Sequence, residues 1–227
     1  MKFPTQATGK TTAEILLRLD AIDFRPNEPF QLTSGWASPV YVDCRKLISF
    51  PKERSEILNL AAKTLADAVG QDAFDVIAGG ETAGIPYAAL LAEHMSLPML
   101  YVRKKPKGFG RMAQIEGHFD TGDRILLVED LATDGKSKLK FCKALRDAGA
   151  EVSHAFVIFH YGIFPDEIAA LKTAGITLHA LATWWDVLEA ATRQGAFPET
   201  VLQEVRVFLE DPHAWSAAHG GVASSVS

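Results

Sequence analysis

The chain has 227 residues, of which 48% are hydrophobic and 22% are charged, and its formal net charge is −5. This length suits one large domain, and the composition is that of an ordinary soluble globular protein. The negative charge argues against broad nucleic-acid binding, and no apolar run in the sequence reaches the length of a membrane span.

The cysteines and the amino-terminal residues indicate the cellular compartment of the protein. Cys44 and Cys142 are far apart and show no C-x-x-C spacing, which predicts a reducing compartment, and we expect the cytoplasm. Residues 1–10 lack the apolar centre of a signal peptide. We expect a single domain over residues 1–227: an amino-terminal helix and loop region to about residue 50, an α/β core over about 70–183, and carboxy-terminal helices with a tail over about 184–227.

The hydrophobic pattern predicts helices and strands in alternation. A first helix begins at Thr11 or Thr12, and prolines and a glycine break the segment over residues 24–45 into strands and loops. The expected strands then cover 74–78, 97–102, 125–128, 152–159 and 177–182. The expected helices cover 51–69, 87–94, 139–148, 166–174 and 184–193, with a last helix from Pro198 and a frayed tail over 220–227. This alternation indicates a doubly wound, parallel α/β sheet.

The most informative stretch is residues 125–137. The four apolar residues from Ile125 to Val128 have the pattern of a strand buried on both faces, and two acids, Glu129 and Asp130, end it. A loop of small and polar residues follows and leads directly into a helix. Because the free N–H groups of a helix start attract anions, usually phosphate, we expect an anion at this loop and the two carboxylates against another part of the same ligand.

Two other interpretations of this stretch remain open. Gly135, Lys136 and Ser137 match the end of the P-loop motif of nucleotide hydrolases, but the first glycine of that motif should stand at position 130, where the chain has Asp130. A purely structural interpretation is that acids at a strand end cap the next helix.

Two more loops follow predicted strands. Residues 79–86 form a second strand–glycine loop–helix unit, although a tight turn of this kind needs glycine in any case. Residues 103–117 begin with five cations in nine positions and contain several glycines, which predicts a mobile segment or a solvated, charged hairpin. Ligands of parallel α/β sheets bind beyond the carboxyl ends of the strands, where all three loops fall, and this predicts one shared site.

These motifs resemble those of a known family. Residues 128–137 resemble the phosphoribosyl pyrophosphate (PRPP) signature of the type I phosphoribosyltransferases: an apolar strand, two acids, a two-residue spacer and a loop rich in threonine, serine and glycine. Residues 103–117 resemble the flexible catalytic loop of the orotate phosphoribosyltransferases, with Phe109 in place of the family's histidine. Asp134 and Lys136 also depart from the family, whose members mostly carry threonine and glycine there.

The amino-terminal segment carries the same resemblance. In orotate phosphoribosyltransferases a hood over the base pocket has a related pattern, matched here by Ser34, Gly35, Ser38, Pro39, Tyr41, Asp43 and Arg45. Four motifs thus occur in the family's order over about residues 24–161. The resemblance implies transfer of the phosphoribosyl group of PRPP to orotate, giving orotidine 5′-monophosphate and pyrophosphate in pyrimidine nucleotide synthesis.

The family resemblance also implies a role for each site residue. Glu129 and Asp130 would hold the ribose hydroxyls, and Lys107, with Arg103 and Lys104, would neutralise the departing pyrophosphate. The implied 5′-phosphate loop is Leu131, Ala132, Thr133, Asp134, Gly135, Lys136 and Ser137. The implied pyrophosphate loop is Gly79, Gly80, Glu81, Thr82 and Ala83. Thr133 and Tyr41 would contact orotate.

The expected cofactor is Mg²⁺, held through PRPP without direct protein ligands. A homodimer is also implied, in which Arg103 and its loop reach the neighbouring subunit's site, whereas no nucleic-acid or membrane partner is expected. The group that binds the orotate carboxylate stays open, because the hood offers Thr33 and Arg45, and His160 and Tyr161 follow the fourth core strand.

Two alternative functions stay open. One is a type I phosphoribosyltransferase for another base. The other is a PRPP-binding regulator without catalysis, which the lysine loop and the lack of a basic amino-terminal DNA-binding domain oppose.

Overall fold

A six-stranded sheet forms the centre of the molecule, in the order β10-β9-β8-β5-β6-β7. The computed structural model describes residues 5–32, 35–108, 114–133 and 135–222. The strands of this sheet are β5 (Val76–Gly80), β6 (Met99–Val102), β7 (Ile115–Glu116), β8 (Arg124–Ala132), β9 (Glu151–His160) and β10 (Thr177–Thr183). Every neighbouring pair is parallel except β6 with β7. The predicted α/β fold with a mostly parallel sheet is therefore confirmed.

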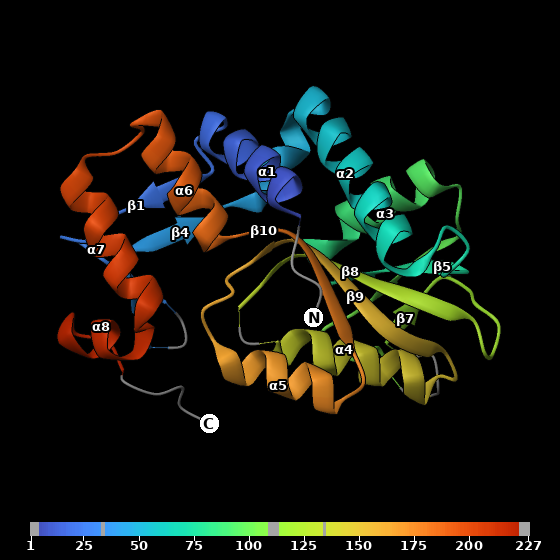
Figure 1. Cartoon of the computed structure of the whole chain (residues 1–227). Helices are drawn as coiled ribbons and strands as arrows, with labels where there is room; N and C mark the ends of the chain where they lie inside the picture. The colour runs from blue at the N-terminus through green and yellow to red at the C-terminus, as the bar shows by residue number, and fades with distance from the viewer. Residues whose placement is uncertain (1–4, 33–34, 109–113, 134, 223–227) are drawn as a thin grey trace.

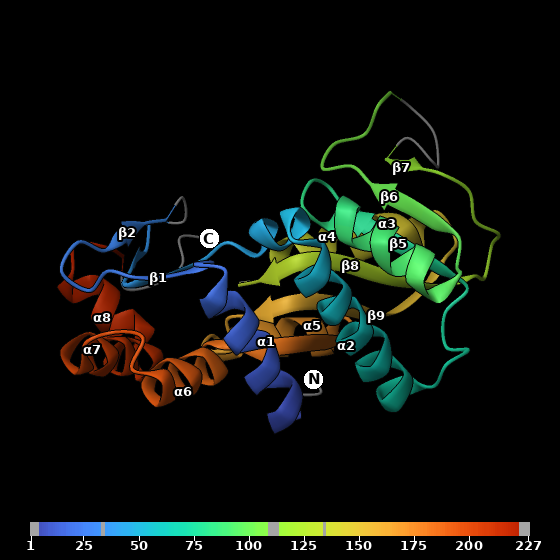
Figure 2. The same cartoon turned by 90° about the horizontal axis from the view of Figure 1, so that it is seen from above.

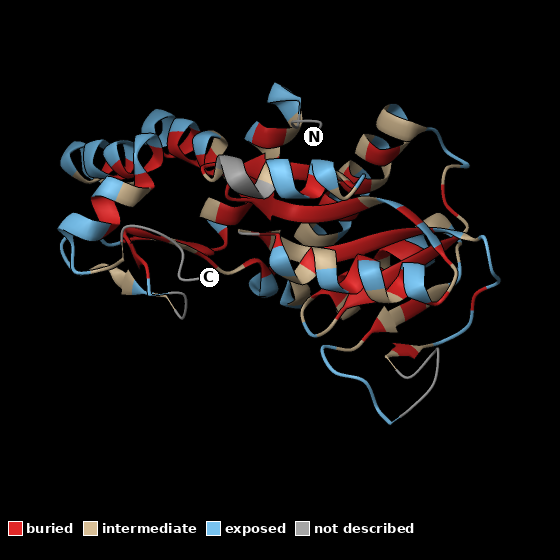
Figure 3. Cartoon of the chain, turned by 90° about the horizontal axis from the view of Figure 1, so that it is seen from below, coloured by how far each residue is buried: buried red, intermediate tan, exposed pale blue. Residues whose placement is uncertain are grey.

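Helices cover both faces of this sheet (Figure 1). On one side lie α1 (Gln6–Arg18), α2 (Pro51–Val69) and α3 (Gly84–Met95), and on the other lie α4 (Lys136–Asp147) and α5 (Pro165–Thr173). Successive residues of β8 enter opposite cores: Leu126 and Val128 join the α1–α3 side, whereas Ile125 and Leu127 join the α4–α5 side. This alternation explains why the strand is an unbroken apolar run, and Figure 3 shows the central strands buried along most of their length.

The order of the strands creates a switch point between β5 and β8. After β5 the chain passes through α3 to β6 on one side, and after β8 it passes through α4 to β9 on the other. The two loops that leave the carboxyl ends of β5 and β8 therefore start side by side and diverge. Open α/β sheets bind their ligands in the crevice that such a divergence leaves.

The hood and the carboxy-terminal helices share one end of the molecule (Figures 1 and 2). The hood contains the pairs β1 (Ile22–Phe24) with β4 (Val40–Val42) and β2 (Phe30–Gln31) with β3 (Ala37–Ser38), and it ends in the 3₁₀ helix η1 (Cys44–Ser49). The helices are α6 (Trp184–Gln194), α7 (Glu199–Glu210) and α8 (Pro212–Ala218). None of the helices in the described part of the chain is both long enough and apolar enough to cross a bilayer.

Ser216 of α8 joins these two regions. Its buried hydroxyl accepts a hydrogen bond from the Ala37 N–H (3.1 Å) and donates one to the Val222 carbonyl (2.8 Å), while the Val222 N–H donates to Gly35 (3.0 Å). Residues 220–222 are thus bound to the hood, and the frayed tail predicted from residue 220 is wrong at its start. The small and polar composition of this segment predicted fraying. The tertiary hydrogen bonds that hold it could not be predicted, because they leave no local pattern in the sequence.

Several predicted boundaries also change. The first helix begins at Gln6, because the Thr5 side chain accepts from the Thr8 N–H, and not at Thr11 or Thr12. A further helix, α8, follows the one predicted to be last. The predicted strand 125–128 continues to Ala132, since Glu129, Leu131 and Ala132 pair with β9 although β5 ends its pairing at Val128. The two acids therefore lie within the strand and not beyond its end.

Candidate active site

Glu129 is the first acid of β8 and is almost fully buried. Its Oε2 atom lies 2.6 Å from the Lys138 ammonium and accepts a hydrogen bond from the Ser137 hydroxyl at 3.0 Å. Its Oε1 atom faces the end of β5, where a Cβ placed on Gly80 would lie 2.7 Å away. Only a glycine at position 80 lets the pyrophosphate loop pass this close to the carboxylate.

Asp130 lies on the opposite face of the strand, because neighbouring side chains in a strand alternate. Burial raises the pKa of its carboxyl above the ordinary value, and the negative charge of Glu129 raises the pKa further, whereas Lys138 lowers it. The charge of Asp130 in turn raises the pKa values of Cys44 and Tyr87, after the larger effect of their own burial. The second acid thus faces η1 and α3, while the first faces α4.

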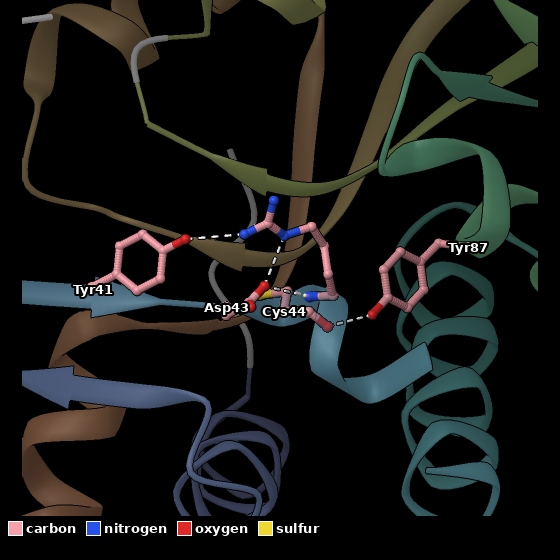
Figure 4. A network of polar contacts seen from close by, with 5 residues as sticks. Tyr41, Asp43, Cys44 and Tyr87 are labelled. Atoms are coloured by element: carbon pink, nitrogen blue, oxygen red, sulfur yellow. Dashed lines mark hydrogen bonds and ion pairs between the residues drawn. The ribbon is translucent and has the colours of Figure 1, made fainter. Parts of the chain in front are cut away.

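A polar network on the Asp130 side ties the hood to the core (Figure 4). The Arg45 guanidinium donates to Asp43 Oδ1 through Nε (2.8 Å) and to the Tyr41 hydroxyl through Nη2 (3.0 Å). The hydrogen bond with Asp43 and that residue's charge raise the pKa of Arg45, and the charge of Asp130 adds to this effect. The Tyr87 hydroxyl of α3 donates to the Cys44 carbonyl at 2.5 Å. The structure thus places Arg45 within electrostatic range of Asp130, and Tyr41 is hydrogen-bonded to Arg45.

The loop between β8 and α4 leads into the amino end of α4. Gly135, with φ of +66°, is the N-cap of α4, and none of the described side chains caps this helix. Asp134 lies outside the described residues, Thr133 is half-buried and Lys136 is exposed. The exposed N–H groups of a helix start form an anion site, so this geometry suits a phosphate.

The pyrophosphate loop, Gly79 to Ala83, leaves β5 beside this loop. The Glu81 N–H donates to the Val102 carbonyl (2.9 Å), and the Glu81 carboxylate accepts from the Lys104 N–H (2.6 Å). The peptide bond between Glu81 and Thr82 is cis. Glu81 therefore joins the pyrophosphate loop to the beginning of the basic segment after β6, and the structure brings these two predicted elements together.

The basic segment joins β6 to β7 and is thus a hairpin. Arg103 exchanges backbone and side-chain hydrogen bonds with Gln114, and its guanidinium lies 3.4 Å from Glu116 Oε1. Lys104, Lys105 and Lys107 are exposed, whereas Phe109 and Arg111 lie outside the described residues. Of the predicted cations, Arg103 is turned toward its own hairpin, and the lysines extend from it.

Two features of the site were missed by the sequence analysis. Lys138 was not predicted, although it stands three residues before Phe141 and seven before Leu145 and therefore shares their buried face. That placement was the available signal. The contact of Tyr87 with Cys44 joins elements 43 residues apart, so no local pattern indicates it. For the base pocket, His160 and Tyr161 are buried, and Thr33 and Ser34 lie outside the described residues.

Comparison with known proteins extends this picture. The family model of the phosphoribosyl transferase domain matches residues 51–171. Orotate phosphoribosyltransferase of Cereibacter sphaeroides is 56% identical over 215 residues, which cover 95% of this chain and 93% of that protein. The crystal structure of orotate phosphoribosyltransferase from Aeropyrum pernix has 31% identity and a TM-score of 0.67, with 80% of this chain and 99% of that one covered.

A structure with a bound ligand is also similar. Orotate phosphoribosyltransferase of Mycobacterium tuberculosis in complex with PRPP has 25% identity and a TM-score of 0.60, over 79% of this chain and 98% of that one. The region matched by the family model contains the loop after β5, the basic hairpin and both acids of β8. The chain therefore belongs to the phosphoribosyl transferase family, in the branch of the orotate phosphoribosyltransferases.

Proposed function

We propose that this chain transfers the phosphoribosyl group of PRPP to orotate, yielding orotidine 5′-monophosphate and pyrophosphate. The observation that carries the proposal is the switch point, where a glycine loop, two adjacent acids and the amino end of α4 meet at the carboxyl ends of β5 and β8. This arrangement offers one subsite for each phosphate-bearing end of PRPP and a third for the ribose between them. The identity of 56% to an orotate phosphoribosyltransferase supports the same substrate pair.

The reaction is a displacement at the anomeric carbon. The C–O bond to pyrophosphate breaks with its electron pair on oxygen, and a ring nitrogen of orotate forms the new C–N bond and releases its proton to water. The ribose carries oxocarbenium character in between, so the negative charge of Asp130 stabilises the developing positive centre while its carboxylate holds a ribose hydroxyl. Backbone N–H groups of the loop after β5, together with Lys104 and Lys107, offset the charge that grows on pyrophosphate.

The proposed cofactor is Mg²⁺ bound chiefly by oxygens of PRPP. Within the described residues, no three His, Cys, Asp or Glu side chains gather into a metal site, and Glu129 is already paired with Lys138. This donor set suits an ion that arrives with its substrate. When bound, Mg²⁺ would neutralise part of the pyrophosphate charge. Titration of activity with EDTA and then with Mg²⁺ tests this cofactor.

A homodimer with shared sites is the proposed assembly, and the cytoplasm is its proposed location. The exposed Lys104, Lys105 and Lys107 extend from the β6–β7 hairpin, which is how a loop that serves a neighbouring site would be presented. Mixing Asp130→Asn and Lys107→Ala subunits tests the sharing, because each mixed dimer contains one site with both native residues. Mixing should restore about a quarter of wild-type activity, whereas unshared sites would give no recovery.

The decisive experiment compares bases and nucleotides with purified protein. PRPP should raise the unfolding temperature and ATP should not, and orotate should be the base with the highest kcat/KM. Higher kcat/KM with another base would replace orotate in the proposal. PRPP binding without turnover of any base would identify a regulator instead of an enzyme.

A further inference from the structure

Lys138 is a lysine on the apolar face of α4. It is 5% exposed, and it shares this face with Phe141, Cys142 and Leu145, all buried. Taking an ammonium group out of water costs several kcal/mol unless an opposite charge and hydrogen bonds compensate it. If stability alone had determined this position, we would expect an apolar residue there. The contacts of the Lys138 ammonium group therefore indicate the function of its charge.

The Lys138 ammonium contacts both ends of the loop between β8 and α4. It lies 2.6 Å from Glu129 Oε2, donates to the Leu131 carbonyl at 2.5 Å, and donates to the Ser137 hydroxyl at 3.2 Å. These contacts use the three N–H donors of an ammonium group. Since the Ser137 hydroxyl also donates to Glu129 Oε2, one network joins the end of β8 to the first turn of α4.

From this network we infer that Lys138 is a positioning residue for the phosphoribosyl transfer. It fixes the Glu129 carboxylate with Oε1 directed at Gly80, and it holds Leu131 and Ser137, the residues on either side of the phosphate loop, in place without touching PRPP. The inference rests on the proposed function and divides the labour of the two acids. Glu129 and Lys138 together position the loops, and Asp130 remains the carboxylate that contacts the ribose.

The charge of Lys138 has a second consequence, for Asp130. Burial and the charge of Glu129 raise the pKa of Asp130, and Lys138 opposes them. The other titratable groups around Asp130 are Asp43, the N-cap of η1, Cys44 and Arg45 on η1, and Tyr87 on α3. Removal of Lys138 alone should therefore raise the pKa of Asp130 and move the acid limb of the pH–rate profile to higher pH.

The test is a set of three variants and a matched control, measured as kcat and KM over a range of pH, with PRPP binding by calorimetry. Lys138→Met keeps the length of the side chain without its charge, Lys138→Met/Glu129→Gln removes both charges, and Lys138→Arg keeps the charge. The control is Lys140→Met, an exposed lysine of the same helix. Wild-type turnover of orotate tests the proposed function independently of every variant.

In Lys138→Met we expect kcat/KM for PRPP to fall by about 10- to 100-fold, since small displacements of positioned groups have effects of this size. The acid limb of its pH–rate profile should move to higher pH. In the double variant this limb should return toward its wild-type position, because the negative charge at position 129 is then removed as well. Lys138→Arg should recover part of kcat/KM, and Lys140→Met should behave as wild type.

Two results would overturn the inference. One is wild-type kcat/KM and acid limb in Lys138→Met. The other is a loss that follows only the folded fraction, with no movement of the acid limb. If Lys138→Met does not fold, the double variant decides: lowered kcat/KM in a folded protein supports the inference, and wild-type kcat/KM contradicts it.

Discussion

The two ends of strand β8 handle charge in opposite ways. At the amino end, Arg124 donates to the Asp75 carboxylate from its backbone N–H (2.9 Å), from Nε (2.9 Å) and from Nη2 (2.7 Å), and both side chains are partly exposed. These bonds lower the pKa of Asp75 to about 2. At the carboxyl end, burial and Glu129 raise the pKa of Asp130. One aspartate is easier to ionise in the folded protein, and the other is harder.

The opposite pKa shifts of Asp75 and Asp130 indicate that the amino end of β8 stabilises the fold, whereas the carboxyl end serves the active site. The Asp75–Arg124 pair gains from ionisation, as expected for a contact that only joins the amino ends of two central strands. The surroundings of Asp130 raise the pKa of its carboxyl, and groups with pKa values shifted in this way gather at sites that bind or react. We infer that the charge of Asp130 at the carboxyl end of β8 lowers the stability of the folded protein. The variants below test this inference, from the largest expected effect to the smallest.

Asp130→Asn should have the largest effect on activity. We expect kcat to fall by about 10²- to 10³-fold, as on removal of a charge that faces the transition state. The unfolding temperature should be unchanged or higher. Because the folded-state pKa of Asp130 is raised, its favourable contribution is complete below the unfolded pKa and is lost as pH rises through the folded pKa.

The advantage of the variant should therefore appear as pH rises out of the acid range, which thermal unfolding at several pH values measures. Asp147→Asn, at the exposed end of α4, is the control. Turnover near the wild-type rate would remove Asp130 from the site.

Lys107→Ala tests whether the basic hairpin contributes charge to the site at the carboxyl end of the sheet. If Lys107 offsets charge that appears only as pyrophosphate leaves, kcat should fall by about 10- to 100-fold while KM for PRPP changes little. Steady-state kinetics with Lys63→Ala as the control, an exposed lysine on α2, gives the measurement. A change confined to KM would mean that Lys107 binds the ground state and the transition state equally.

The sequence predicted the parallel core because its strands are apolar runs and its loops carry glycine. It also predicted which loops converge, since the carboxyl ends of parallel strands lie on one edge. Where it failed, tertiary contacts decided. The acids Glu129 and Asp130 were expected to end their strand, as charges usually do, but pairing with β9 continues through both of them.

Lys138 was missed for a related reason. A lysine in the first turn of a helix is normally solvated, and only its distance from Phe141 and Leu145 along the helix indicates the buried face. The partner that makes its burial tolerable, Glu129, belongs to another element, and no local pattern of the sequence links the two residues. Residues 220–222 were likewise expected to fray, because their hydrogen bonds reach residues more than 170 positions earlier in the chain.

Ser216→Ala extends the comparison from the sheet to the hood. The change removes two buried hydrogen bonds and leaves the Ala37 N–H without its acceptor, so unfolding should become easier by about 1–3 kcal/mol. If the carboxy-terminal helices hold the hood over the base, KM for orotate should rise while KM for PRPP stays near wild type. Ser55→Ala, an exposed serine of α2, is the matched control. Equal changes in both KM values would mean that the hydrogen bonds of Ser216 support the whole domain and not the hood alone.

Asp75→Asn should have the smallest effect, and its sign should be opposite to that of Asp130→Asn. The folded-state pKa of Asp75 is lowered to about 2, so the stability from its ionisation is present above the unfolded pKa and is lost as pH falls from about 4 toward 2. Wild type should therefore unfold at a slightly higher temperature than Asp75→Asn at neutral pH, and the difference should vanish in that acid window. Arg124→Lys should lose part of the same difference, since a lysine cannot form the two-pronged contact. Kinetic constants should not change in either variant, because this pair lies at the amino ends of β5 and β8, opposite the carboxyl ends that carry the loops. A fall in kcat would show that charge at the amino end of β8 is felt at Asp130, and the two ends of the strand would have to be treated as one electrostatic unit.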